Sequence, residues 1–206
     1  MTRGYKPTDR PVARAGDYAF KECDPQERQA ARDLVRQFHY TRAMSNTGKF
    51  FCAKRDGVVV GAAVYLPPLL AAAVKHAQGD PKRVISLSRL VVAPGEPQNV
   101  AGMLIAASLK LLVAQGKYDT IVTYADMSEG HTGTVYRATN AQSCGITPRA
   151  TYWIDPETGC RVSQQSKRRR SNERMLELGY EPRVSPGKHC FKWKFDRRGR
   201  LAQPKQ

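Results

Sequence analysis

The alternation of strand-like and helix-like apolar patterns is the feature that most constrains how this chain can fold. An apolar strand is predicted over residues 84–92, and a helix with one buried face over 99–114. A second strand is predicted over 118–124. Alternating helices and strands pack as a central sheet with helices on both of its faces, so the sequence predicts a mixed α/β fold.

The rest of the chain supplies further elements of the same kind. A helix is predicted to begin at Asp24, a capping residue followed by proline and then by Glu27, and to end near His39 and Tyr40. We also expect a hairpin over 50–66 that turns at Asp56-Gly57, helices over 69–77, 133–143 and 171–178, and strands over 152–154 and 189–195.

Length and composition indicate one globular domain. A chain of 206 residues with 41% apolar and 25% charged residues can bury a core but is short for two domains. Its apolar stretches are too short to cross a membrane, and no apolar signal-peptide core follows Met1. We expect a single domain over residues 1–206 in the cytoplasm, with a flexible segment over 1–15.

The excess of positive charge indicates a polyanionic partner. The formal net charge is +16, and residues 161–206 hold 14 lysines and arginines against 4 acidic residues. Such a surplus favours nucleic acid ahead of an anionic membrane, so 161–206 is predicted to be a basic DNA-binding part. Phe191, Trp193 and Phe195 alternate with lysines, which predicts rings in the core and lysines outside. The candidate DNA-binding residues are Lys167, Arg168, Arg169, Arg170, Lys192 and Lys194.

The cysteines and two of the histidines show no pattern typical of a site. Cys23, Cys52, Cys144, Cys160 and Cys190 are widely scattered, and no C-x-x-C pair occurs among them. Neither a zinc knuckle nor a disulfide framework is indicated, so we expect most of them to be small buried residues. His76 and His189 have no reactive neighbours in the sequence and are expected to be structural.

Reactive side chains are densest over residues 124–140. Asp126 follows a predicted strand, where α/β sheets place their sites, and Gly130 and Gly133 allow a tight turn around His131. Tyr136 and Asn140, four positions apart, are expected to share one face of the next helix. These groups could form a metal site or an acid/base set. They could also be a helix cap, a turn hydrogen bond and a core tyrosine.

Two further features lie outside that segment. Arg89 alternates with Ile85, Leu87 and Val91 on an apolar strand face, where a guanidinium needs a partner, and Asp126 is a candidate. His39 lies at a predicted helix end, where the alternative is an ordinary surface histidine.

The order of elements is similar to the GNAT acyltransferase fold, and the motifs resemble the Mom DNA-modification proteins of Mu-like phages. The resemblance covers roughly residues 30–150 and rests on His39-Tyr40, Leu87-Ser88-Arg89-Leu90-Val91, Tyr124-Ala125-Asp126, Gly130-His131-Thr132-Gly133, Tyr136, Ala138 and Asn140. It implies an enzyme that converts adenine in duplex DNA to a carbamoylmethyl derivative at its exocyclic amine and so protects phage DNA from host restriction. It also implies a bound iron ion.

The resemblance assigns the functional residues by motif position. The implied set is His39, Tyr40, Ser88, Arg89, Asp126, His131 and Tyr136. His39 and Asp126 would be the iron ligands, since non-haem iron accepts a nitrogen and a carboxylate oxygen. Tyr136 would be a proton donor or a third ligand.

One departure from ordinary GNAT enzymes concerns the coenzyme. Their pyrophosphate-binding turn is replaced here by residues 95–102, in which Pro97 lacks an amide hydrogen and Glu96 carries a negative charge. Binding of acetyl-CoA is therefore doubtful, and the donor of the added group is not identified. The alternatives are a CoA-dependent GNAT acetyltransferase and a non-catalytic DNA-binding protein on a degenerate GNAT scaffold. A homodimer is left open.

Overall fold

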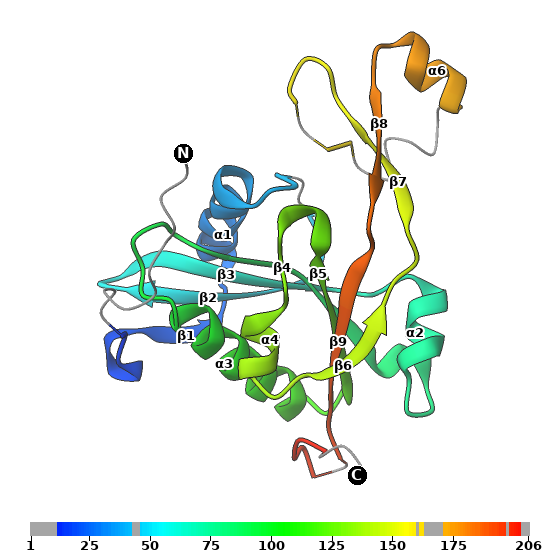
Figure 1. The fold of residues 1–206 in the computed structure, drawn as a ribbon. Helices are drawn as coiled ribbons and strands as arrows, with labels where there is room; N and C mark the ends of the chain where they lie inside the picture. Colours follow the sequence, from blue (N-terminus) through cyan, green and yellow to red (C-terminus); the bar gives the residue numbers. More distant parts are fainter. Residues whose placement is uncertain (1–11, 43–45, 160, 163–170, 197, 203–206) are drawn as a thin grey trace.

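A seven-stranded mixed sheet forms the centre of the computed structural model (Figure 1), which describes residues 12–42, 46–159, 161–162, 171–196 and 198–202. The strand order is β1-β2-β3-β4-β5-β9-β6. The bounds are β1 Ala19–Glu22, β2 Lys49–Arg55, β3 Val58–Leu66, β4 Val84–Val92, β5 Thr120–Asp126, β6 Gln142–Ile146 and β9 Lys188–Lys194. The helices are α1 Pro25–Phe38, α2 Leu70–His76, α3 Val100–Ala114, α4 Thr134–Ala138 and α6 Asn172–Glu177.

Helices cover both faces of the sheet because its strands are apolar on both sides. Phe51 and Ala53 of β2 pack in the core against α3, whereas Phe50 and Cys52 pack with α1 on the opposite face. Sheets covered on both faces have such near-continuous apolar strands. The predicted mixed α/β fold with helices on both faces is confirmed. Among the described helices, none is long and apolar enough to cross a membrane.

Local signals in the first half of the chain act as the sequence predicts. Asp24 caps α1, and its carboxylate and that of Glu27 each accept the other residue's backbone N–H. The hairpin of β2 and β3 turns at Asp56 and Gly57, whose φ angles of 51° and 80° suit an Asp-Gly turn. Ala13, inside the segment expected to be flexible, pairs its backbone N–H and C=O with the Asn99 side chain.

The helix predicted over 133–143 is wrong beyond Ala138. Asn140 adopts a left-handed conformation with φ 62°, and the chain then enters β6, which pairs with β9. The expectation that Tyr136 and Asn140 share a helix face is therefore wrong too. Pairing with a neighbouring strand has overridden a helical pattern, a tertiary effect that local periodicity does not contain.

A two-stranded arm, β7 (Ala150–Ile154) and β8 (Glu181–Ser185), lies between β6 and β9 in the sequence. Figure 1 shows it extending away from the central sheet with α6 at its far end. Sequence patterns indicated β7 and α6, but β8 was missed because only Ser185 of its five residues is buried. Of the arm, β8 belongs to residues 161–206, which the sequence marks as strongly basic, as does α6.

Candidate active site

A pocket of about 550 Å³ opens where β4 and β5 separate. These parallel strands pair from Val84 with Thr120 as far as Leu87 with Thr123, and both strands continue beyond the last pair. The pocket wall includes five of the seven residues that the resemblance assigned to function. These five are His39, Tyr40, Ser88, His131 and Tyr136. The structure thus brings together residues from three separate segments of the chain, 39–40, 88 and 131–136.

Two glycines shape one wall of this pocket. Gly130 and Gly133 adopt left-handed conformations, with φ angles of 70° and 76°, and His131 lies between them. The His131 N–H donates to the Asp126 carbonyl over 3.2 Å. A Cβ atom on Gly133 would clash with the ring of Phe191. The predicted tight turn is confirmed, and it needs glycine for both conformation and space.

Three aromatic rings meet at the mouth of the pocket. His39 stacks on Tyr40 with ring centroids 4.4 Å apart, and the His131 ring lies 5.6 Å from Tyr40, edge to face. Burial, with the nearby charge of Arg89, lowers the pKa of His39 to about 4. Burial, with the charge of Asp126, raises the pKa of Tyr40 to about 12. Near neutral pH this corner therefore holds an uncharged imidazole and a protonated phenol.

Tyr136 lies in the pocket wall, where burial keeps its phenol protonated. Its ring packs against Phe191 and Trp193 at centroid distances of 5.6 and 6.0 Å. Burial raises the pKa of its hydroxyl, and a hydrogen bond with Thr123 opposes that shift. The side chain is thus both a packing residue and a phenol at the pocket wall, which joins the two alternatives drawn from the sequence.

Asp126 is buried at the end of β5 and has two cationic partners. Its Oδ2 atom lies 2.9 Å from Arg161 Nη1 and 2.9 Å from Lys188 Nζ, and its Oδ1 accepts the Ser128 N–H. Burial opposes ionisation, but the hydrogen bond from Lys188 holds the pKa of this carboxyl below its ordinary value. The expected ion pair between Asp126 and Arg89 is wrong. The Arg89 guanidinium instead donates hydrogen bonds to the carbonyl oxygen and the Oγ atom of Ser88.

The contacts of His39 and Asp126 do not fit an iron ion bound between them. The Nδ1 atom of His39 accepts the Thr41 N–H, so the neutral ring carries its proton on Nε2, the nitrogen that would have to bind metal. The Asp126 carboxylate is already neutralised by two cations, which would repel a third. Iron remains an implication of the resemblance.

A second pocket of about 340 Å³ adjoins the first and shares Phe38, His39 and Tyr40 with it. Its other wall comes from the arm, where the guanidinium of Arg161 lies 4.1 Å from the Tyr152 ring centroid. Sequence reasoning missed Arg161 and Lys188 as neighbours of the site. The signal available was a buried carboxylate followed by a basic segment, since a buried Asp needs cationic partners.

The residues that replace the pyrophosphate turn are engaged in structural contacts. Glu96 is buried, accepts the Tyr18 hydroxyl over 2.6 Å and pairs with Arg55 over 2.9 Å. Asn99, at the start of α3, holds the backbone of Ala13. This end of α3 is therefore packed against the beginning of the described chain.

The candidate DNA-binding residues are only partly within the described structure. Phe191 and Trp193 are buried in the core as predicted, whereas Phe195 is only half-buried against it. Lys192 and Lys194 are also half-buried. Lys167, Arg168, Arg169 and Arg170 lie outside the described residues.

The fold and this pocket between separating strands define the class: the chain has the GNAT acetyltransferase fold. An N-acetyltransferase from Staphylococcus aureus Mu50 is 14% identical, with a TM-score of 0.53 over 86% of this chain and 98% of that chain. The ribosomal-protein-S18-alanine N-acetyltransferase from Escherichia coli is 11% identical, with a TM-score of 0.52 over 85% of this chain and 92% of that chain. At such identities the likeness concerns the fold alone.

Within that class, the chain belongs to the Mom protein family, whose model matches residues 17–188. The match includes all seven residues implied by the resemblance and both strands of the arm. No curated protein matches the chain. Membership of this family supports a role in phage DNA modification.

Proposed function

We propose that this protein converts adenine in double-stranded DNA to a carbamoylmethyl derivative at the exocyclic amine, and so protects phage DNA from restriction. The observation that carries the proposal is the convergence of His39, Tyr40, Ser88, His131 and Tyr136 on one pocket in a chain of the Mom family. A transferase-type reaction needs protonated and unprotonated groups beside its reactants, and this pocket supplies both.

The two adjoining pockets suit a reaction with two reactants. We assign the pocket beside the arm to the base, because Arg161 and Tyr152 line it and arginine and aromatic groups bind and stack on bases. The donor of the added group would occupy the larger pocket. His39 and Tyr40 belong to both walls and would lie where the two reactants meet.

Proton transfer can be divided among the pocket residues. When the amine nitrogen gains a carbon atom it must lose a proton, and His131 carries an exposed imidazole with a ring nitrogen that can accept one. Tyr40 and Tyr136 remain protonated and can donate to a leaving group. The Nε2–H of His39 is a hydrogen-bond donor that can orient a reactant. Asp126 acts as a positioning residue that holds the His131 turn, Arg161 and Lys188 in place.

The direct test is mass spectrometry of nucleosides from plasmid DNA of bacteria that express the chain. A deoxyadenosine adduct of carbamoylmethyl mass is expected, and His39→Ala is expected to remove it. Unmodified DNA from a folded chain, with no rescue by phage proteins, would contradict the proposal. A thermal shift with acetyl-CoA would then favour the acetyltransferase alternative.

DNA binding is a separate part of the proposal. We assign it to Lys167, Arg168, Arg169, Arg170, Lys192 and Lys194. Because phosphate contacts release counterions, alanine at Lys192 and Lys194 should weaken binding and reduce the slope of log affinity against log salt by about 2. An unchanged salt dependence would remove these two lysines from the interface.

A further inference from the structure

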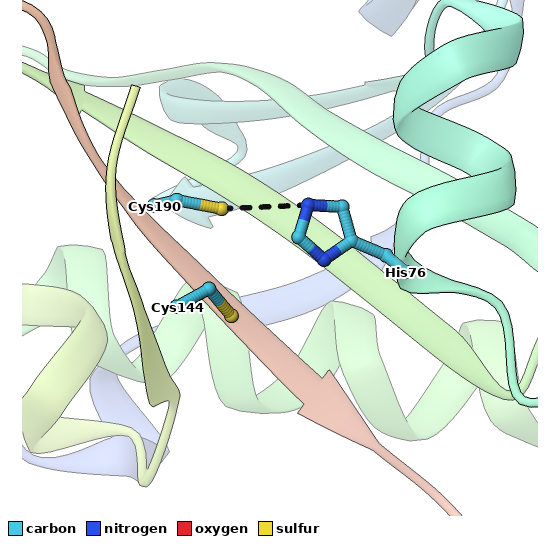
Figure 2. A group of neighbouring side chains, drawn as sticks. All are labelled: His76, Cys144 and Cys190. Atoms are coloured by element: carbon cyan, nitrogen blue, oxygen red, sulfur yellow. Dashed lines mark hydrogen bonds between the residues drawn. The ribbon is translucent and has the colours of Figure 1, made fainter. Parts of the chain in front are cut away.

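His76, Cys144 and Cys190 come together on the face of the sheet covered by α2. Their ligand atoms, one nitrogen and two sulfurs, all lie within 4.8 Å of one another. Figure 2 shows His76 extending from the end of α2 toward Cys190, with Cys144 on the neighbouring strand. The three residues are far apart in the sequence, so the fold alone produces this cluster.

Strand pairing between β6 and β9 brings Cys144 beside Cys190, next to a β-bulge. The pairing of β6 with β9 shifts between Ser143 and Ile146, so that Cys144 and Gly145 together lie opposite Cys190. Gly145 has φ 87°, a conformation that suits such a bulge. Because Ser143 lies opposite Phe191, the next residues along the two strands, Cys144 and Cys190, both point to the other face of the sheet, where His76 also lies.

One pair of the three ligand atoms already has the spacing of a tetrahedral metal site. The Sγ atom of Cys190 lies 3.6 Å from Nε2 of His76. In a tetrahedral zinc site, with bonds of about 2.3 Å to sulfur and about 2.0 Å to nitrogen, neighbouring sulfur and nitrogen ligands are roughly 3.5 Å apart. Small side-chain rotations would bring Cys144 to the same spacing.

The cluster also lies where the fold needs an attachment. Helix α2 has seven residues, of which Ala73 and His76 are buried, while Leu70 and Val74 are 75% and 59% exposed. So little apolar burial holds a short helix weakly. An ion shared by His76 and the two cysteines would join α2 to β6 and β9.

We propose that His76, Cys144 and Cys190 bind a zinc ion, with a fourth position open to water. Two thiolates and an imidazole form a ligand set that zinc prefers and that hard cations do not. The ion holds α2 against β6 and β9 on the α2-covered face, and it is separate from the set of His39 and Asp126 discussed for iron. The site does not depend on the proposed DNA reaction.

Cobalt provides the first test, with the full chain kept reduced and stripped of metal by a chelator. Added Co²⁺ should give the visible bands of a tetrahedral site and a near-ultraviolet thiolate band, and one equivalent of Zn²⁺ should abolish both. The absence of these bands in the wild-type chain overturns the proposal. If the chain kept without reductant takes up no metal and has a mass two hydrogens lower than the reduced chain, Cys144 and Cys190 would be assigned to a disulfide instead.

Matched variants assign the ligands. Cys144→Ser, Cys190→Ser and His76→Asn should each weaken zinc binding by more than about 100-fold, beyond the cost of losing an outer-shell partner. Cys23→Ser is the control, because Cys23 is also buried but packs in an apolar cluster beside α1. His39→Ala should leave the cobalt spectrum unchanged. Wild-type zinc affinity in the three ligand variants would overturn the assignment. If a variant fails to fold, the cobalt spectrum of the wild-type chain still tests the proposal.

Discussion

Asp126 and Glu27 are two buried carboxylates with the same kind of partners and different surroundings. Each accepts a backbone N–H at the start of a helical turn, and each has two cationic neighbours. Glu27 pairs with Lys21 of β1 and Lys54 of β2 and so fastens α1 to the sheet. Asp126 pairs with Arg161 beside the arm and Lys188 of β9, next to the pocket. One arrangement stabilises the scaffold, whereas the other positions the walls of a site.

The largest expected effect is on activity, from Asp126→Asn. The amide keeps an acceptor for Ser128 but loses both ion pairs and leaves two cations near His39 and Tyr40. We expect adenine modification to fall by 100-fold or more, about 3 kcal/mol in activation free energy. Nucleoside mass spectrometry measures it, with circular dichroism to verify folding. Glu27→Gln is the control, and equal activity in both variants would erase the difference between the two carboxylates.

Glu27→Gln should change stability instead. The amide can still accept the Asp24 N–H, so the variant isolates the charge that Lys54 and Lys21 contact. We expect a loss of about 2 kcal/mol in unfolding free energy, because the main partner, Lys54, is largely shielded from water. The midpoint of thermal unfolding should fall by roughly 4–8 °C. A midpoint in Glu27→Gln equal to that of the wild type would show that α1 does not depend on these two ion pairs.

Arg161→Ala should have a smaller effect on activity than Asp126→Asn. It removes one of the two cations on Asp126 and the group that lies over Tyr152, while Lys188 remains. We expect modification to fall by roughly 10-fold, about 1.4 kcal/mol. Arg161→Lys, which retains the charge, should recover part of the loss. A larger loss than in Asp126→Asn would mean that Arg161 acts on a reactant directly.

The smallest difference is expected in acid, between the wild type and Glu27→Gln. Lys54, with the Asp24 amide, lowers the pKa of Glu27 from its ordinary value of 4.5 to about 2. A lowered pKa stabilises the fold above pH 4.5, and that contribution is lost as the pH falls toward 2. Unfolding by urea at a series of pH values should show the two chains converging in this range. A difference in unfolding free energy that stays constant with pH would mean that the charge of Glu27 is not what stabilises the wild type.

The sequence predicted those parts of the fold whose signals are local. The cap at Asp24, the turn at Asp56-Gly57 and the glycines around His131 each depend on residues a few positions apart. The pocket residues were found through motif resemblance, which carries tertiary information that periodicity lacks. The spacing of His39 and Ser88 by itself gives no hint that they share a pocket.

What could not be predicted depends on contacts between distant segments. Strand β8 is exposed, so no apolar alternation marks it, and Pro182 within it argues against a strand. The partners of Asp126 lie 35 and 62 residues further along the chain. Likewise, His76 gains Cys144 and Cys190 as neighbours only after the sheet has formed. Ion-pair and metal-ligand assignments need the three-dimensional arrangement that the sequence pattern leaves open.

The arm leaves the central sheet and returns to it at one place. Thr147 donates its N–H to the Lys188 carbonyl over 2.9 Å, and its hydroxyl accepts the Lys188 N–H, so the two ends of the intervening segment are hydrogen-bonded neighbours. A segment whose ends meet can be lengthened, shortened or exchanged without shifting the strands that flank it. The segment that contains β7, α6 and β8 is thus an insertion between the paired strands β6 and β9. Changes within this insertion would reach the site through Arg161 and Tyr152, which line the second pocket.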